Sequence, residues 1–333
     1  MKTTAVLGAG SWGTALAVHL ARSEHRVRLW ARDEAFVREL WASRVNGRYL
    51  PDVPLADAIE PTDSLATALD GAKFVVLAVP SHGLRAVVRN ALPLLAPGTV
   101  LVSTAKGLET DSLERMSQVV GEETGDCCPI VVLSGPSFAA EVARGLPTAV
   151  LAASEDEAPA AAVQEHFRGP GLRLYLNNDV VGVEIGGALK NVIAIAAGVV
   201  EGLHLGHNAL AALITRGLVE ITRVACAEGG RRETLAGLGG LGDLVLTCTG
   251  NLSRNRHVGI ELGRGRPLNE ILGNMRMVAE GVRTTGAALA LGARHGIELP
   301  IAAQMKDVLD GRTRPADAVE ALMGRRQRAE VDG

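Results

Sequence analysis

The sequence predicts an α/β protein: a mostly parallel sheet with crossover helices in the N-terminal part, followed by an all-α C-terminal part. Up to about residue 177, short runs rich in Val, Leu and Ala alternate with helix-length segments, as in buried parallel strands. From residue 178 onward, helical patterns follow one another and are separated by glycine-rich turns such as residues 237–242. We therefore expect two domains, residues 1–177 and 178–333, which suits a chain of 333 residues.

Seven apolar runs in the first part are expected to be strands, and the first is too short to be a secretory leader. They occupy residues 3–8, 26–30, 73–79, 99–104, 129–134, 148–153 and 172–176. Helix-like segments lie between them, among them residues 13–21, 34–42, 84–92 and 113–120. Each segment is long enough to cross over a sheet, so the repeating strand–helix–strand units predict parallel pairing.

Composition excludes several classes of protein. The 34 Lys and Arg against 37 Asp and Glu give a net charge of −3, so no bulk positive field attracts nucleic acid or an anionic membrane. Hydrophobic residues form 47% of the chain, which excludes wholesale disorder. Charged residues interrupt the apolar segment 180–200, so we expect a buried helix and no membrane span. The four cysteines form neither a disulfide framework nor a metal motif, which favours a reducing cytoplasm.

The first expected strand runs directly into a glycine-rich turn, GAGSWG, and then into a helix. This is the dinucleotide-binding fingerprint of Rossmann-type sheets in its required strand–turn–helix context. We expect Gly8 to allow the tight turn, Gly10 to let a pyrophosphate approach the backbone, and Gly13 to let the helix pack closely. The pattern predicts a nicotinamide or flavin dinucleotide, and a plain tight turn is the alternative.

The second expected strand is followed by Arg32 and Asp33, where Rossmann-type proteins distinguish the two nicotinamide cofactors. A carboxylate at this point accepts the ribose 2′-hydroxyl of NADH, whereas an arginine holds the 2′-phosphate of NADPH. Arg32 comes first and favours NADPH, while Asp33 opposes that interpretation. A solvated Arg–Asp turn without a cofactor role is a further alternative.

Two further strands are followed by residues that suit a bound ligand. Lys106 follows the run 99–104, and the segment SGPSF, with Gly135 and Ser137, begins at the end of the run 129–134. The carboxyl ends of parallel strands share one edge of a sheet, where open α/β folds bind ligands. We therefore expect these residues to face a ligand, with a surface lysine and an ordinary strand-to-helix turn as the alternatives.

Lys190 and Asn191 interrupt an otherwise apolar helix in the second part. Because an unpartnered buried cation is costly, the lysine either extends to the surface or lines a cleft, where a lowered pKa would suit proton transfer. Asp243 lies in a glycine-dense turn before another apolar helix, and is either a helix cap or a partner of Lys190.

The segment NLSRN combines the hydroxyl of Ser253, the guanidinium of Arg254 and the amide of Asn255 at an expected helix start. This composition suits a phosphate monoester, although ordinary capping explains it as well. His204 and His207 could share one face of a helix but have no third ligand nearby, so we expect no metal site. The basic run 325–328 lacks interleaved aromatic residues and predicts an exposed helix end.

Together these motifs resemble those of the bacterial-type NAD(P)H-dependent glycerol-3-phosphate dehydrogenases. The resemblance covers nearly the whole chain in the family's order, and LSGPSFA, GALKN and NLSRNR are its most specific parts. It implies a Rossmann domain followed by a helical domain like the C-terminal domain of 6-phosphogluconate dehydrogenase. It also implies reversible reduction of dihydroxyacetone phosphate to sn-glycerol 3-phosphate with NADPH or NADH, for glycerophospholipid synthesis, by a cytoplasmic homodimer.

The resemblance also implies roles for individual residues. Lys190 becomes the proton donor and acceptor, and Lys106 contacts both substrate and cofactor. The substrate pocket is completed by Gly135, Ser137, Asn191, Asp243, Ser253, Arg254 and Asn255. The dinucleotide is lined by Gly8, Gly10, Ser11, Trp12, Gly13, Arg32, Tyr49, Lys106, Ala139, Arg254, Val278 and Glu280.

The implied mechanism makes opposite demands on Lys190 in the two directions. Protonated Lys190 donates to the alkoxide that develops during reduction, whereas the reverse reaction needs the neutral amine. We expect burial and Lys106 to lower its pKa, with Asp243 opposing that shift. One alternative is a β-hydroxyacid or 6-phosphogluconate-type dehydrogenase, whose substrate is an acid. The other is an NAD(P)H-binding sensor without catalysis.

Overall fold

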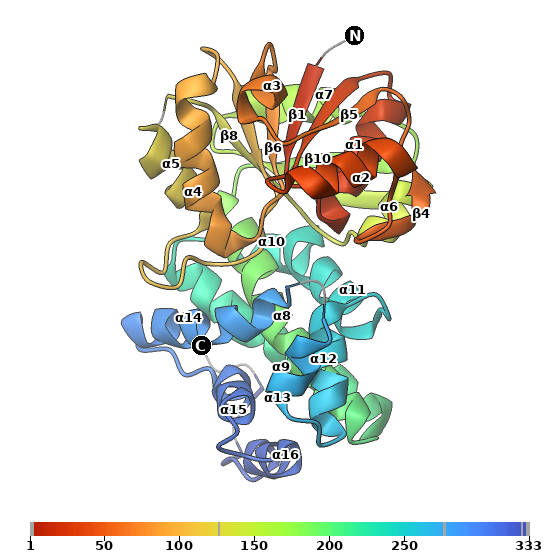
Figure 1. Ribbon diagram of the computed structural model, residues 1–333. Helices are drawn as coiled ribbons and strands as arrows, with labels where there is room; N and C mark the ends of the chain where they lie inside the picture. Colours follow the sequence, from red (N-terminus) through yellow and green to blue (C-terminus); the bar gives the residue numbers. More distant parts are fainter. Residues whose placement is uncertain (1–2, 126, 276–277, 328, 331–333) are drawn as a thin grey trace.

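The computed structural model describes residues 3–125, 127–275, 278–327 and 329–330. A sheet with helices on its faces forms the N-terminal part, and a group of helices around α8 (Val180–Gly202) forms the C-terminal part (Figure 1). Every described strand precedes residue 178. The predicted fold class, a mostly parallel Rossmann-type sheet followed by a helical region, is therefore confirmed.

The main sheet has eight strands in the order β10-β9-β8-β7-β6-β1-β2-β5. Their bounds are β1 Thr3–Leu7, β2 Arg26–Trp30, β5 Ile59–Thr62, β6 Phe74–Leu77, β7 Val100–Ser103, β8 Ile130–Ser134, β9 Thr148–Ala153 and β10 Leu172–Asn177. All neighbours are parallel except β8 and β9. A separate antiparallel hairpin consists of β3 (Val45–Asn46) and β4 (Leu50–Pro54).

The seven predicted strands are present, and the sheet is mostly parallel as predicted, with one antiparallel pair, β8 and β9. β9 is antiparallel to β8, and the connection between them contains the six-residue helix α6 (Ala139–Arg144). β10 is an edge strand, so its residues alternate between buried and exposed at its start. The edge strand β5 was not predicted, because its sequence IEPT is short and only weakly apolar.

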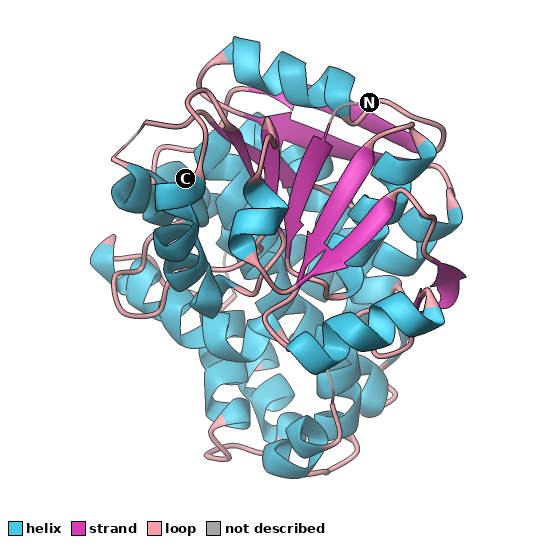
Figure 2. Ribbon diagram, turned by 45° about the horizontal axis from the view of Figure 1, so that its top comes forward, coloured by secondary structure: helices cyan, strands magenta, loops and turns pink. Residues whose placement is uncertain are grey.

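Helices cover both faces of the sheet (Figure 2). Their bounds are α1 Ser11–Arg22, α2 Glu34–Ser43, α3 Leu65–Leu69, α4 Ser81–Ala91, η1 Leu92–Leu94, α5 Met116–Thr124 and α7 Glu157–His166. Successive residues of β1 enter two separate hydrophobic clusters, Val6 on one face and Leu7 on the other, as the strand period requires. The helix predicted at 113–120 begins only at Met116, because Leu113 has a positive φ of 65°.

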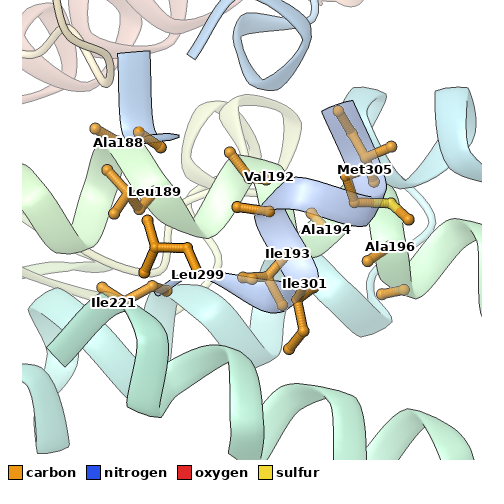
Figure 3. Packing of buried hydrophobic residues seen from close by; sticks show 14 of the residues in the cluster. Ala188, Leu189, Val192, Ile193, Ala194, Ala196, Ile221, Leu299, Ile301 and Met305 are labelled. Carbon is orange, nitrogen blue, oxygen red and sulfur yellow. The ribbon is translucent and has the colours of Figure 1, made fainter. Parts of the chain in front are cut away.

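The helical part is built around α8. The other helices are α9 Gly206–Ala227, α10 Arg232–Ala236, η2 Leu238–Gly242, α11 Asp243–Thr249, α12 Arg254–Gly263, α13 Leu268–Gly273, α14 Glu280–Arg294, α15 Pro300–Leu309 and α16 Pro315–Met323. Figure 3 shows Leu189, Val192 and Ile193 of α8 in a cluster with Ile221 and Met305. By length and composition α8 could cross a membrane, but 94% of its most apolar window is buried inside the protein. The predicted buried helix is confirmed.

Of residues 237–242, predicted as a turn, Leu238–Gly242 instead form the π-helical segment η2, which continues into α11. A Cβ at Gly186 of α8 would collide with the carbonyl oxygen of Gly239, so these glycines let η2 pack directly on α8. This contact places Asp243, the first residue of α11, beside the central helix.

The predicted histidine pair and the predicted basic run both lie in the C-terminal half. His204 has a φ of 57° in the turn after α8, so it does not share a helix with His207. Arg325, in the basic run, pairs with Glu298 at 3.0 Å on the surface. Residue 328 of that run lies outside the described part of the chain.

Candidate active site

The glycine-rich turn after β1 has a geometry that fits a dinucleotide. Gly8 has a φ of 119°, and a Cβ there would lie 2.6 Å from the carbonyl oxygen of Ala78. A Cβ at Gly13 would collide with the carbonyl oxygen of Gly8, so α1 begins in direct contact with the turn. At Gly10 a Cβ would meet no described atom within 4 Å, which leaves the backbone open to a ligand. A pyrophosphate at the start of α1 requires this open backbone.

α8 crosses the carboxyl edge of the sheet at Gly187. A Cβ at Gly187 would lie 2.9 Å from the Ser134 hydroxyl, at the end of β8, and 3.7 Å from Cγ of Lys106. The absence of a side chain therefore lets the helix approach the strand ends closely. One turn later, the same helix brings Lys190 to this edge, where α/β sheets bind ligands.

Lys190 is buried, with 6% of its surface exposed, and its Nζ donates to Oδ1 of Asp243. Nζ also donates to the Thr247 hydroxyl at 2.9 Å, and Thr247 donates to the carbonyl oxygen of Asp243 at 2.6 Å. The alternative in which the lysine extends to the surface is therefore wrong. The N-cap of α11 is Gly242, so the cap alternative for Asp243 is wrong as well.

Lys106 brings a second cation to the same carboxylate from the other half of the chain. Its Nζ lies 2.8 Å from Oδ2 of Asp243 and donates to the carbonyl oxygen of Gly135 at 2.9 Å. The Ser137 hydroxyl donates to the same carbonyl oxygen at 2.9 Å. Gly135 has a φ of 137°, which side chains rarely adopt. The structure therefore unites Lys106, Gly135, Lys190 and Asp243, which the sequence analysis had singled out separately.

Burial lowers the pKa of Lys190 to about 7. The loss of water around the ammonium group is the largest cause, Asp243 opposes it, and Lys106 lowers the pKa further. The predicted direction and its causes are confirmed. An amine that is half protonated near neutral pH can both donate and accept a proton.

A close contact between α8 and α12 brings the NLSRN segment to the same region. A Cβ at Gly198 would collide with the carbonyl oxygen of Arg256, so the two helices touch through their backbones. Ser253 is the N-cap of α12, and its hydroxyl accepts from the amide of Arg256 at 3.2 Å. The start of this helix is thereby fixed against α8, which carries Asn191 at its middle.

Asn255 connects three helices. Its Nδ2 donates to Oδ1 of Asn191 at 2.9 Å, and its Oδ1 accepts from the amide of Gly281 at 3.0 Å, at the start of α14. Both asparagines are buried, whereas Arg254 is exposed at the first position of α12. The structure thus joins Asn191 to Asn255 and places Arg254, the residue before Asn255, at the start of α12.

Glu280 links α14 to the sheet edge. Its carboxylate accepts from the amide of Ser81 at 3.1 Å and from the Ser81 hydroxyl at 2.7 Å, where α4 begins after β6. Val278 is exposed just before it. Among the N-terminal residues implied to line the dinucleotide, Ser11 and Trp12 begin α1 and Ala139 begins α6.

Arg32 follows the end of β2, and Tyr49 lies in the turn between β3 and β4. Asn46 donates to the carbonyl oxygen of Ala9 at 3.0 Å and accepts from the amide of Tyr49 at 3.1 Å, which ties the β3–β4 hairpin to the turn. The Tyr49 ring packs edge-on against Phe36 with 5.6 Å between ring centroids. Arg32 is exposed.

Glu184 of α8 forms a second junction between the two halves. Oε1 accepts from the amide of Ser117 at 2.8 Å, and Oε2 accepts from the Ser117 hydroxyl at 2.6 Å and from Arg115 at 2.7 Å. Only 3% of the Glu184 side chain is exposed. We call Glu184, Arg115 and Ser117 the interdomain clamp.

The sequence analysis did not identify Thr247, Ser81, Asn46 or the clamp. Thr247 follows Asp243 by one helical turn, and this spacing could have identified it once Asp243 was chosen. Ser81 and Asn46 act through partners far away in the sequence, so no local pattern marks them.

Comparison with known proteins agrees with this geometry. The family model described as NAD-dependent glycerol-3-phosphate dehydrogenase N-terminus matches residues 3–160, and that described as its C-terminus matches residues 179–320. This chain belongs to the NAD-dependent glycerol-3-phosphate dehydrogenase family. The resemblance noted in the sequence is thereby confirmed, and it extends over both halves.

Individual members of the glycerol-3-phosphate dehydrogenase family match along nearly their whole length. The glycerol-3-phosphate dehydrogenase (NAD(P)+) of Koribacter versatilis is 53% identical and covers 99% of both chains. Its namesake from Geobacter sulfurreducens is 54% identical over 98% of both chains. The crystal structure of glycerol-3-phosphate dehydrogenase from Coxiella burnetii is 42% identical, with a TM-score of 0.94, and covers 97% of this chain and 99% of that one.

Proposed function

We propose that this protein reversibly reduces dihydroxyacetone phosphate to sn-glycerol 3-phosphate with NADPH or NADH, in the supply of glycerophospholipid precursors. The observation that carries the proposal is the contact of Lys190 and Lys106, one from each half of the chain, with the buried carboxylate of Asp243. This group lies at the sheet edge next to the ends of β7 and β8. Membership of the family supports the substrate and the cofactor.

The glycine turn is the proposed dinucleotide site, where the bound cofactor supplies or accepts the hydride. Gly8 and Gly13 hold the turn close to its neighbours, and Gly10 leaves room for the pyrophosphate. Glu280 orders the sheet edge between this turn and Lys190 through its bonds to Ser81.

Lys190 moves the proton. As the C2 carbonyl is reduced, an alkoxide develops, and protonated Lys190 donates a proton to that oxygen. Asp243 and Thr247 hold Nζ in place, and the lowered pKa makes loss of the proton accessible near neutral pH. In the reverse direction neutral Lys190 accepts the proton of the C2 hydroxyl.

The start of α12 is the proposed phosphate site. Arg254, an exposed residue, begins this helix, and the positive end of the ten-residue helix lies there as well. Ser253 and Asn255 flank it, and Asn255 holds Asn191 beside Lys190, where the Asn191 amide can steady the carbonyl oxygen. Phosphate binding thereby orients the distant carbonyl.

The proposal also covers the division into two domains, the cellular location and the oligomeric state. Residues 1–177 would bind the dinucleotide and residues 178–333 would supply Lys190, with the division between β10 and α8. All four cysteines are free thiols, which suits a cytoplasmic protein. A homodimer follows from the resemblance, and light scattering coupled to size-exclusion chromatography measures its mass directly.

The test is steady-state kinetics of Lys190→Met with saturating NADPH. We expect kcat to fall about 1000-fold, the upper part of the range for a general acid, while the Kd for NADPH changes less than about threefold. Lys306→Met is the matched control, because this lysine pairs with Asp310 on the surface and should turn over normally. Full activity of Lys190→Met would overturn the mechanism.

NADPH binding by the unmodified protein without any turnover would favour the sensor, and turnover only of a hydroxyacid would favour the other dehydrogenase class.

A further inference from the structure

Three charged side chains lie where the adenosine end of the cofactor is expected: Arg32, Asp33 and Arg48. We propose that Asp33 is a helix cap and not a reader of the ribose hydroxyl, and that Arg48 is the second cation, with Arg32, of a 2′-phosphate site that makes NADPH the preferred cofactor. This inference rests on the proposed function and specifies which dinucleotide the site selects.

The carboxylate of Asp33 is already engaged on both oxygens. Oδ1 accepts from the amides of Ala35 at 3.0 Å and Phe36 at 3.2 Å, so Asp33 is the N-cap of α2. Oδ2 accepts from Nη1 of Arg48 at 3.3 Å. The bond from Phe36 is the largest of the causes that lower the pKa of Asp33. A carboxylate that caps its own helix is not directed at a ribose diol. The positive end of the helix partly offsets the negative charge of Asp33, so this carboxylate repels a nearby phosphate less.

Arg48 is held rigidly, yet it keeps donors for a ligand. Its Nε and Nη2 lie 2.8 and 2.7 Å from one oxygen of Glu39, and its guanidinium lies 4.6 Å from the centre of the Phe36 ring. A guanidinium has five N–H donors; Nε donates to Glu39 and Nη1 to Asp33, while Nη2 forms an ion pair with Glu39. N–H groups of Nη1 and Nη2 remain for a ligand, and 40% of the side chain is exposed. A planar, preorganised fork of this kind suits a phosphate.

The hairpin that carries Arg48 is fixed to the cofactor turn. Asn46 donates to the carbonyl oxygen of Ala9 at 3.0 Å and to the hydroxyl of Thr14 at 2.7 Å, and both groups belong to the glycine turn or the helix behind it. Arg48, two residues later, reaches back to the residue that follows Arg32. It therefore stands between the glycine turn and the end of β2, where the adenosine ribose binds in Rossmann-type sheets.

The test compares two nucleotides that differ only in the 2′-phosphate, 2′,5′-ADP and 5′-ADP, together with direct titrations of NADPH and NADH followed by protein fluorescence. We expect Arg48→Gln to weaken binding of 2′,5′-ADP and NADPH about tenfold, and of 5′-ADP and NADH less than about twofold, because one charge-assisted bond pair is lost. Arg48→Lys keeps the charge without the fork and should fall in between. Arg38→Gln is the control, since that arginine pairs with Glu34 on the exposed side of α2.

Asp33→Asn separates the two roles of Asp33. Asparagine is an equally good N-cap, so we expect the Kd for NADH to change less than about twofold. A tenfold loss of NADH affinity in this variant would show that Asp33 reads the ribose and would overturn the inference. An equal loss of both nucleotides in Arg48→Gln, with an unchanged melting temperature, would also overturn it. If the unmodified protein binds neither NADPH nor NADH, the proposed function itself fails.

Discussion

Two buried carboxylates join the halves of this protein, and their partners differ in kind. Asp243 lies between the ammonium groups of Lys106 and Lys190. Glu184, on the same helix as Lys190, accepts from the guanidinium of Arg115 and from the amide and hydroxyl of Ser117. Both junctions are nearly closed to water.

The chemical nature of these partners gives the two junctions different roles. A lysine shifts its pKa readily when buried, whereas an arginine stays protonated and a backbone amide carries no charge to lose. The Asp243 junction can therefore exchange a proton with a substrate, while the interdomain clamp holds α8 against the N-terminal half through a guanidinium, a hydroxyl and a backbone amide. Removing either carboxylate should damage the protein in a different way.

Of the two carboxylates, Asp243 is expected to have the larger effect on catalysis when it is changed to Asn. Both lysines lose the carboxylate that stabilises their charge, so less Lys190 is protonated at neutral pH and its Nζ is no longer held. We expect the reductive kcat/KM to fall about 100-fold, a loss of about 2.7 kcal/mol of transition-state stabilisation. Asp317→Asn, which breaks only a surface pair with Arg314, is the matched control. Equal kinetics of the two variants would remove Asp243 from the mechanism.

Glu184→Gln should mainly reduce stability. Loss of one partner from a buried ion pair typically costs about 3 kcal/mol, so we expect the free energy of unfolding in urea to drop by that amount. Glu60→Gln breaks an exposed pair with Arg26 and should cost less than about 1 kcal/mol. The apparent pKa of the reductive rate should not move in Glu184→Gln. If it moves as far as in Asp243→Asn, the two junctions are not distinct.

The pH dependence of the unmodified enzyme gives a smaller, graded effect. Because the pKa of Lys190 is about 7 and reduction needs the protonated amine, the reductive kcat should fall about tenfold per pH unit above that value. The oxidative kcat needs the neutral amine and should instead fall below about pH 7. Asp243→Asn should move both profiles to lower pH, because the carboxylate raises the pKa of Lys190. Profiles with the same slope in both directions would contradict the assigned proton transfer.

Sequence could predict the parts of this account that depend on local pattern. The apolar runs identified seven strands, and the spacing of Gly8, Gly10 and Gly13 identified the cofactor turn, because strand burial and tight turns depend on neighbouring residues. Lys190 stood out since a cation is costly in an apolar helix. The motif resemblance then implied that Lys106 and Asp243 belong to the same substrate pocket.

Contacts between residues that are far apart in the chain could not be predicted from local sequence patterns. The antiparallel pairing of β9 with β8 is a tertiary feature that no local pattern encodes. The bond between Glu184 and Ser117 joins residues 67 positions apart, and Ser81 meets Glu280 across 199 positions. The bond from Arg48 to Oδ2 of Asp33 also depends on tertiary structure, because it forms only when the β3–β4 hairpin lies next to the start of α2.

Chemical rescue of Lys190→Ala tests directly whether Lys190 donates the proton. Small alkylammonium ions would be added to this variant with saturating NADPH and dihydroxyacetone phosphate, and the loss of NADPH absorbance would be followed at fixed pH. We expect a very low rate without the amine and a rate that rises in proportion to the ammonium concentration, more steeply for the more acidic ammonium ions. A rate independent of added amine, in a variant that still binds both NADPH and substrate, would contradict proton donation by Lys190.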